Sequence, residues 1–239
     1  MSAAPADVIT WGRESARASQ WRGDKQVAHI TPLPSSPLPS AEFVRWCLDT
    51  LARRGYKRVV TAALSPLEQV GFLAAGFDVE ERLHLLGLKL GPELPPVPPG
   101  LPQRRVPPWR RPEVLEVDAS AFPPFWQLDS AGLEDSLRAT PVRRFRMAVG
   151  PDRRLAGYAV CGRSGSRGFV QRLAVHPGRQ REGTGRRLLL DGLHWLAHGG
   201  ASRAVVNTQV GNEAALALYL ATGFTEEPIG LSVLSAGLK

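Results

Sequence analysis

Length, composition and charge limit the classes of protein to which this chain can belong. Its 239 residues suffice for one large or two small domains, and 43% hydrophobic against 22% charged residues indicate a globular chain. We expect neither a membrane span nor a signal peptide, because no apolar run is long enough and the first residues lack a basic segment. Two cysteines, Cys47 and Cys161, do not make a disulfide framework or a zinc site, so a cytoplasmic protein without a metal is expected.

The net charge of +8 suits a nucleic acid, a phosphorylated cofactor or an acidic protein surface. The arginine pairs at 104–105 and 110–111 are compatible with nucleic-acid binding. We rank this function last, because no platform of aromatic and basic residues accompanies them. We therefore expect neither a nucleic-acid nor a membrane partner. A monomer and a homodimer both stay open.

Three parts follow one another along the chain. Residues 1–90 contain an amphipathic helix at 40–54 and then a strand, a turn and a short helix within 58–77. Residues 91–112 contain nine prolines, which predicts an extended linker. Residues 113–239 are expected to form the second domain.

The second part predicts alternating strands and helices. A strand is expected at 112–120, one or two short helices at 121–140 and strands at 143–150, 154–163 and 167–176. A helix at 185–198, a strand at 203–210, a helix at 213–222 and one or two strands within 224–237 follow.

Two stretches of the chain resemble each other, which indicates a duplicated unit. RVVTAALSPLEQVGFLAAGF (58–77) parallels AVVNTQVGNEAALALYLATGF (204–224), with Phe72 where Tyr219 stands. The first copy has PLPSSPLPS before its helix instead of a glycine loop.

The loop GRQREGTGRRLL (178–189) lies between a predicted strand and a predicted helix. It is not a P-loop, because no lysine follows a glycine, and it lacks the third glycine of a dinucleotide fingerprint. Its Q-x-x-G-x-G pattern at 180–185 could place helix N-terminal N–H groups and arginines around a pyrophosphate. A flexible basic turn is the alternative.

LAVHPGRQREGTGRRLL (173–189) followed by NTQVGNEAALALYLATGF (207–224) resembles the GNAT superfamily of acetyl-CoA-dependent N-acetyltransferases. The resemblance covers 113–239, and residues 1–90 resemble a degenerate second copy. It implies an α/β fold with a mixed sheet, the GNAT fold, in a tandem layout. It also implies a single active site, because the first copy lacks the glycine loop.

The resemblance implies where acetyl-CoA (coenzyme A) binds. The pantetheine arm would pair with the main chain of Leu173, Ala174 and Val175, between two splayed parallel strands. The pyrophosphate would lie on Gln180, Arg181, Glu182, Gly183, Thr184, Gly185 and Arg186. Asn212 would lie beside the pantetheine, although it is equally good as a plain N-cap.

The resemblance also implies catalytic roles. A main-chain N–H of Leu173 or Ala174 would stabilise the oxyanion, and Tyr219 would be the general acid that protonates the leaving thiolate. Tyr219 also falls on an apolar helix stripe, so a core role is the alternative.

The general base is not evident from the sequence. Gln171 stands where many relatives carry a glutamate, and His176 fits a turn residue better than a base. Asp129, Glu134 and Asp135 could hold a cationic amine or could be solvated charges.

Other residues near this region keep two interpretations. Phe122, Phe125 and Trp126 could line an acceptor pocket or pack in the core. Cys161 has no evident histidine partner, so an acyl-cysteine is not expected. The expected function is transfer of an acetyl group to a primary amine of a small molecule, peptide or protein; the alternative is a non-catalytic acyl-CoA-binding protein.

Overall fold

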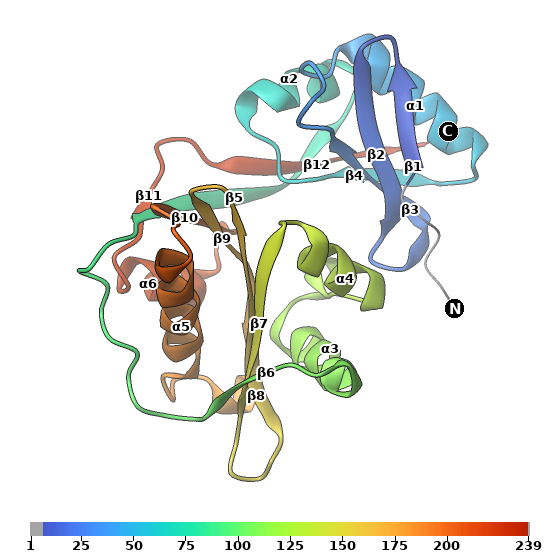
Figure 1. The fold of residues 1–239 in the computed structure, drawn as a ribbon. Coiled ribbons are helices and arrows are strands. Elements are labelled where there is room, and N and C mark those ends of the chain that lie inside the picture. Colours follow the sequence, from blue (N-terminus) through green and yellow to red (C-terminus); the bar gives the residue numbers. More distant parts are fainter. Residues whose placement is uncertain (1–6, 239) are drawn as a thin grey trace. The chain divides into compact units, whose positions relative to one another are not determined.

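The computed structural model describes residues 7–238, which divide into two compact units (Figure 1). Of the described residues, the first contains 7–85, 207–211 and 227–238, and the second contains Leu86–Val206 and Asn212–Glu226. This division differs from the expected boundaries at 90 and 113, because the last strand of the chain belongs to the first unit. Among the described residues, no helix is long and apolar enough to cross a membrane.

The first unit is a mixed sheet with two helices. Its elements are β1 (Asp7–Trp11), β2 (Glu14–Trp21), β3 (Asp24–Pro32), α1 (Ala41–Arg53), β4 (Arg58–Thr61), α2 (Pro66–Ala74), the first part of β5 (Asp78–Lys89) and β12 (Leu231–Gly237). The strand order is β1-β2-β3-β4-β12-β5, and β3 and β4 are parallel. α1 buries Phe43, Val44, Cys47 and Leu51 against this sheet, which confirms the amphipathic helix predicted at 40–54.

The start of α1 is closed by groups of the first unit itself. Ser40 is the N-cap, and its hydroxyl accepts a hydrogen bond from Phe43 N at 3.1 Å. The Glu14 carboxylate accepts hydrogen bonds from Ser40 N (2.5 Å) and Ser40 Oγ (2.8 Å). The preceding Pro39 carbonyl lies against Gly71 of α2 so closely that a Cβ at residue 71 would clash with it. The helix N-terminus is therefore already occupied.

The second unit contains most of the remaining elements. These are β6 (Gln103–Arg105), η1 (Pro108–Arg110), α3 (Arg111–Ala121), η2 (Pro124–Trp126), α4 (Ser130–Arg138), β7 (Val142–Val149), β8 (Leu155–Ser164), β9 (Arg167–Val175), η3 (Pro177–Arg179), α5 (Thr184–His198), the first part of β10 (Arg203–Gln209), α6 (Glu213–Leu220) and β11 (Thr225–Glu226). The strand order is β10-β9-β8-β7-β6. Figure 1 shows α5 and α6 on one side of these strands and α3 and α4 on the other. β8 is therefore covered on both faces and almost fully buried.

Most expected elements of the second unit are confirmed, but one is wrong. Residues 112–120 form a helix, α3, instead of a strand. Pro112 stands in its first turn, where a missing N–H costs nothing, and Val114 and Val117 bury together at a helical spacing of three. The sequence analysis predicted a strand because the apolar residues of so short a segment fit both the two-residue period of a strand and the 3.6-residue period of a helix.

The proline-rich segment 91–112 packs against the second unit. The carbonyl of Pro95 lies 2.8 Å from His194 Nε2, and the carbonyl of Pro98 accepts a hydrogen bond from Arg187 Nη1. Strand β6, inside the segment, pairs with β7. The segment thus lies along α5 and β7, and residues 108–112 are helical, in η1 and the first turn of α3.

Candidate functional site

The two parallel strands of the second unit separate after a short paired stretch. β10 pairs with β9 only where Arg203–Val205 meet Arg167–Phe169. β9 keeps its antiparallel pairing with β8 as far as Val175, so only its other edge is open. A separated parallel pair leaves main-chain donors and acceptors available for an extended ligand.

The loop after β9 has two left-handed residues before helix α5. Arg181 has φ = 67° and Gly183, the N-cap of α5, has φ = 78°. A non-glycine residue in this region is uncommon, and alternating conformations of this kind turn successive N–H groups to one side, where they can bind an anion. A Cβ at Gly185 would make ordinary van der Waals contacts, at 3.4 Å from Leu218 Cδ2 and 3.5 Å from Val175 Cγ2.

The arginines around this loop divide into two groups. Arg179 contacts Asp152 (3.2 Å) and Glu182 (3.8 Å), and Arg187 binds the Pro98 carbonyl. Within residues 7–238, Arg181 and Arg186 are exposed without a side-chain partner. Only these two arginines of the loop are therefore free to bind a ligand.

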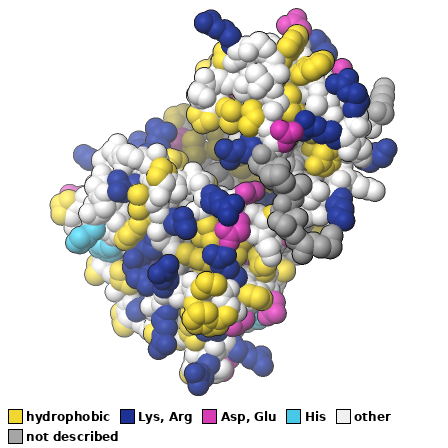
Figure 2. Space-filling view, turned by 45° about the vertical axis from the view of Figure 1, so that its right-hand side comes forward, with side chains coloured by type: hydrophobic (Ala, Val, Ile, Leu, Met, Phe, Trp, Pro, Cys, Tyr) yellow, Lys and Arg dark blue, Asp and Glu magenta, His cyan; other side chains and the backbone are white. Residues whose placement is uncertain are grey.

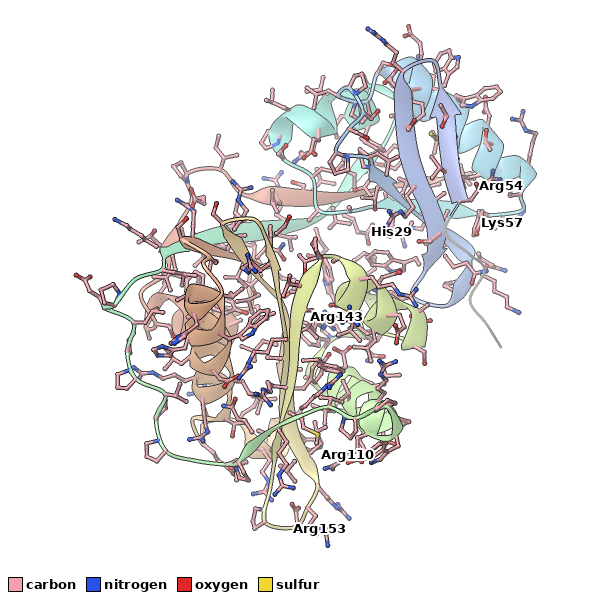
Figure 3. All side chains as sticks on the ribbon, in the orientation of Figure 1. His29, Arg54, Lys57, Arg110, Arg143 and Arg153 are labelled. Carbon is pink, nitrogen blue, oxygen red and sulfur yellow. The ribbon has the colours of Figure 1, made fainter. Side chains whose placement is uncertain are left out.

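The turn between β7 and β8 lies beside the loop through the Arg179–Asp152 contact. Arg110 Nη2 donates to the carbonyl of Arg153 at 3.0 Å, and Figure 3 labels both residues near this turn. On the face in Figure 2, Lys and Arg side chains are interspersed with hydrophobic and uncharged ones.

Tyr219 lies in α6 with its ring inside an apolar cluster. Its side chain is 5% exposed, and its ring centroid is 5.7 Å from that of Phe224. In the part of the chain that the structure describes, the hydroxyl has no hydrogen-bond partner. Burial raises the pKa of Tyr219, so the hydroxyl stays protonated at neutral pH. The protonated hydroxyl is therefore available as a proton donor.

Asn212 caps the same helix. Its Oδ1 accepts a hydrogen bond from Ala215 N at 3.2 Å, as the N-cap interpretation predicts.

A β-bulge interrupts β9 next to the candidate oxyanion donor. Val160 of β8 is opposite Arg172 and Cys161 is opposite Val170, so Gln171 is the extra residue. Both polar atoms of its amide are buried without a partner among the described residues. The amide lies over Gly162, where a Cβ would come within 2.7 Å of Gln171 Oε1. Gln171 thus supplies no base, as its amide chemistry already indicated.

The acidic residues considered for amine binding are mostly committed elsewhere. Asp129 caps α4 by accepting from Gly132 N at 2.8 Å, and Glu134 forms an ion pair with Arg111. Asp135 is exposed on α4. His176 is a turn residue, since its Nδ1 accepts from Gly178 N at 3.1 Å.

The aromatic residues after α3 and the buried cysteine pack inside the second unit. Trp126 is buried with its ring 5.2 Å from that of Phe125. Phe122 lies under the Arg172 guanidinium, at 3.6 Å. Burial raises the pKa of Cys161 to about 12, so it remains a thiol.

A buried charged cluster was missed by the sequence analysis. The Asp118 carboxylate accepts hydrogen bonds from Tyr158 Oη (2.5 Å) and from Arg172 Nε (2.7 Å) and Nη2 (2.8 Å). No sequence signal pointed to it, because Asp118 stood in a segment expected to be a strand.

Comparisons with known proteins agree with this geometry. Residues 111–224 match the model of the Acetyltransferase (GNAT) family. A tandem GNAT protein from the clavulanic acid biosynthesis pathway is 16% identical, with a TM-score of 0.69 over 95% of this chain and 79% of that one. GCN5-related N-acetyltransferases from Sphaerobacter thermophilus (14%, TM-score 0.66, 95% and 77%) and Kribbella flavida (14%, TM-score 0.63, 97% and 89%) are also similar. At such identities the likeness is one of fold. No curated protein matches the chain.

Proposed function

From the premise that residues 111–224 belong to the GNAT acetyltransferase family, we propose that the protein transfers an acetyl group from acetyl-CoA to a primary amine. The acceptor is a small molecule, a peptide or a protein, and transfer occurs by direct attack in a ternary complex. The observation that carries the proposal is the separation of β9 from β10 beside a loop with two left-handed residues.

The residues present fit coenzyme A. The open edge of β9 offers the main chain of Leu173–Val175 to the pantetheine amides. The loop from Gln180 to Arg186 offers N–H groups, the N-terminus of α5 and the free guanidinium groups of Arg181 and Arg186 to the pyrophosphate. Asn212 would contact the pantetheine from the start of α6. When bound, acetyl-CoA supplies the acetyl group as a reactive thioester.

The chain itself supplies two functions at this site. The Leu173 N–H would donate to the acyl oxygen on which negative charge develops, next to the bulge at Gln171. The Tyr219 hydroxyl would give its proton to the departing sulfur. The amine would lose its proton to water, since the Gln171 amide cannot accept a proton and Asp129 and Glu134 are held by other groups.

The chain has one cofactor site in this proposal, although it has two GNAT-related units. In the first unit, β3 and β4 stay paired along the whole of β4, from Arg58 to Thr61. The N-terminus of α1 holds the Glu14 carboxylate, and Pro39 is packed against Gly71. In the described part of the first unit, β3 and β4 therefore leave no gap between them, and the N-terminus of α1 is taken up, which supports a degenerate copy in a tandem layout.

Two expectations stay part of the proposal. The enzyme is placed in the cytoplasm, where the free thiols of Cys47 and Cys161 remain reduced. It acts without a nucleic-acid or membrane partner, as a monomer or a homodimer. A non-catalytic acyl-CoA-binding protein is the competing function, because Gln171 stands where many relatives carry a glutamate.

Incubation with acetyl-CoA and a panel of amines and peptides tests the proposal through release of free CoA thiol. Release that depends on an amine supports an enzyme. Tight CoA binding without release on any acceptor supports the competing function. Calorimetry should give one CoA bound per chain, and two would contradict a single site.

A pair of glycine substitutions tests the loop. Gly183 and Gly165 both have positive φ and open space around the Cβ position, so alanine should cost each about 1–2 kcal/mol of stability. Gly165 lies in the turn at the other end of β9 and is the matched control. Gly183→Ala should weaken CoA binding about tenfold or more, because left-handed geometry aims the N–H groups. Equal CoA affinity of the two variants would refute the assignment.

A further inference from the structure

The buried charged cluster joins three elements of the second unit. Asp118 comes from α3, Tyr158 from β8 and Arg172 from β9. Asp118 is 0% exposed and the Arg172 side chain 10% exposed, so both charges have lost most of their water. The Asp118 carboxylate also accepts a hydrogen bond from Leu128 N at 2.7 Å. Its oxygens are thus fully used by the protein.

Stability alone does not account for such a cluster. Two charges that leave water pay a desolvation penalty which their attraction only partly offsets, and apolar residues of similar volume are often as stable or more so. Buried ionic groups hold their neighbours in one fixed arrangement better than apolar residues do, since hydrogen bonds are directional and apolar contacts are not.

The position of Arg172 indicates which arrangement is fixed. It directly follows the bulged residue Gln171 and directly precedes Leu173, the proposed oxyanion donor. A bulge breaks the regular ladder, so the peptide units around it are less constrained by pairing with β8. The side chain of Arg172 is held instead, because its guanidinium fork binds both carboxylate oxygens of Asp118.

Arg172 also reaches the segment that follows α3. Its Nη2 donates to the carbonyl of Trp126 at 2.7 Å, and its guanidinium lies 3.6 Å from the ring centroid of Phe122. One side chain therefore connects the bulge in β9 to α3 and to η2.

We infer that Arg172 is a positioning residue, which through its clamp on Asp118 holds the bulged backbone so that the Leu173 N–H points at the reacting acyl oxygen. This inference rests on the proposed function. In this role Arg172 acts through the backbone of β9 and not by contact with the cofactor or the acceptor. A displacement of about 1 Å at a donor of this kind can cost a factor of about 100 in rate.

The test separates positioning from stability with a double substitution. Arg172→Met alone leaves Asp118 buried without its partner and should lower Tm by about 10 °C. Asp118→Leu combined with Arg172→Met removes both charges and should recover most of that loss. The double variant should still have kcat lowered by about 30–100-fold. Hydrogen–deuterium exchange of the Gln171–Leu173 backbone should be faster than in the wild type, with CoA affinity little changed.

A second ion pair of the same unit provides the matched control. Arg144 of β7 binds Asp191 of α5 through two hydrogen bonds, of 2.8 and 2.9 Å, and both side chains are 21% exposed. Arg144→Met with Asp191→Leu should leave kcat and the exchange of residues 171–173 unchanged. Arg172→Lys, which keeps the charge but not the fork, should fold stably and lie between wild type and double variant in both readouts.

A double variant, or Arg172→Lys, with wild-type kcat and wild-type exchange at 171–173 would overturn the inference and leave the cluster a structural element. Exchange does not depend on turnover. If the wild type released no CoA on any amine, the proposed function would fail, whereas an unchanged exchange pattern would refute the positioning role independently.

Discussion

Replacement of Tyr219 by phenylalanine removes one oxygen atom from the proposed site and leaves the ring in place. The ring packs against Phe224 in the cluster beneath α5 and α6, so the apolar contacts are kept. The hydroxyl has no hydrogen-bond partner within the described residues. Removing the hydroxyl breaks no hydrogen bond within the described residues, so the variant should be about as stable as the wild type.

The turnover of Tyr219→Phe should fall although its stability is kept. A general acid contributes a factor of about 10²–10⁴, and water can replace part of it, so we expect kcat to fall tenfold or more, or at least about 1.4 kcal/mol in activation free energy. CoA affinity should stay nearly unchanged, because the main chain and the loop carry the binding. Thiol release at saturating acetyl-CoA measures the first quantity and calorimetry the second.

The duplicated unit offers a matched control at Phe72, which occupies the corresponding position in α2. Its side chain is 0% exposed, and its ring is 5.1 Å from that of Phe77 in an edge-on contact. Phe72→Tyr adds a hydroxyl in an apolar core and should cost about 1–3 kcal/mol of stability without changing kcat per folded molecule. Unchanged turnover in Tyr219→Phe would refute the general-acid role and leave Tyr219 as a core residue.

Three further substitutions probe the fold. Burial, and to a lesser extent the nearby Arg22, lowers the pKa of His29 from 6.5 to about 4. Between these two pH values the unfolded state binds more protons than the folded state, so this contribution to stability should be complete above pH 6.5 and should fall as the pH approaches 4. His29→Gln should flatten this pH dependence of the free energy of unfolding, measured by urea titration. Ser40→Ala removes the N-cap bond of α1 and should cost about 0.5–2 kcal/mol by denaturation; no loss would contradict the cap. Gly192→Ala places a Cβ against Cys161 Sγ and should cost about 1–3 kcal/mol, which Cys161→Ala in the same chain should largely restore; additive losses would contradict the contact.

Strong local patterns in the sequence were enough for much of the second unit. The apolar spacing of α5, the helix break at Gly199 and the glycines of the loop all lie within a few residues of the elements they define. Tyr219 and Asn212 could be assigned for the same reason, since both belong to one short strand, turn and helix unit. These residues stay expectations as functional groups until the substitutions above are made.

The parts that sequence reasoning missed depend on contacts between distant residues. No prediction was made for β1–β3, whose alternation is weak, and β12 joins the first unit only by pairing with β4 and β5. α3 looked like a strand because its few apolar residues fit either period.

The sequence by itself predicted the GNAT resemblance, the loop and most elements of the second unit, because those depend on short-range spacing. Only the tertiary structure decided that Asp118 and Arg172, 54 positions apart, form one buried pair beside a bulge. The sequence does not show which charged residues will be buried. Asp118 meets Arg172 only because α3 packs on the sheet.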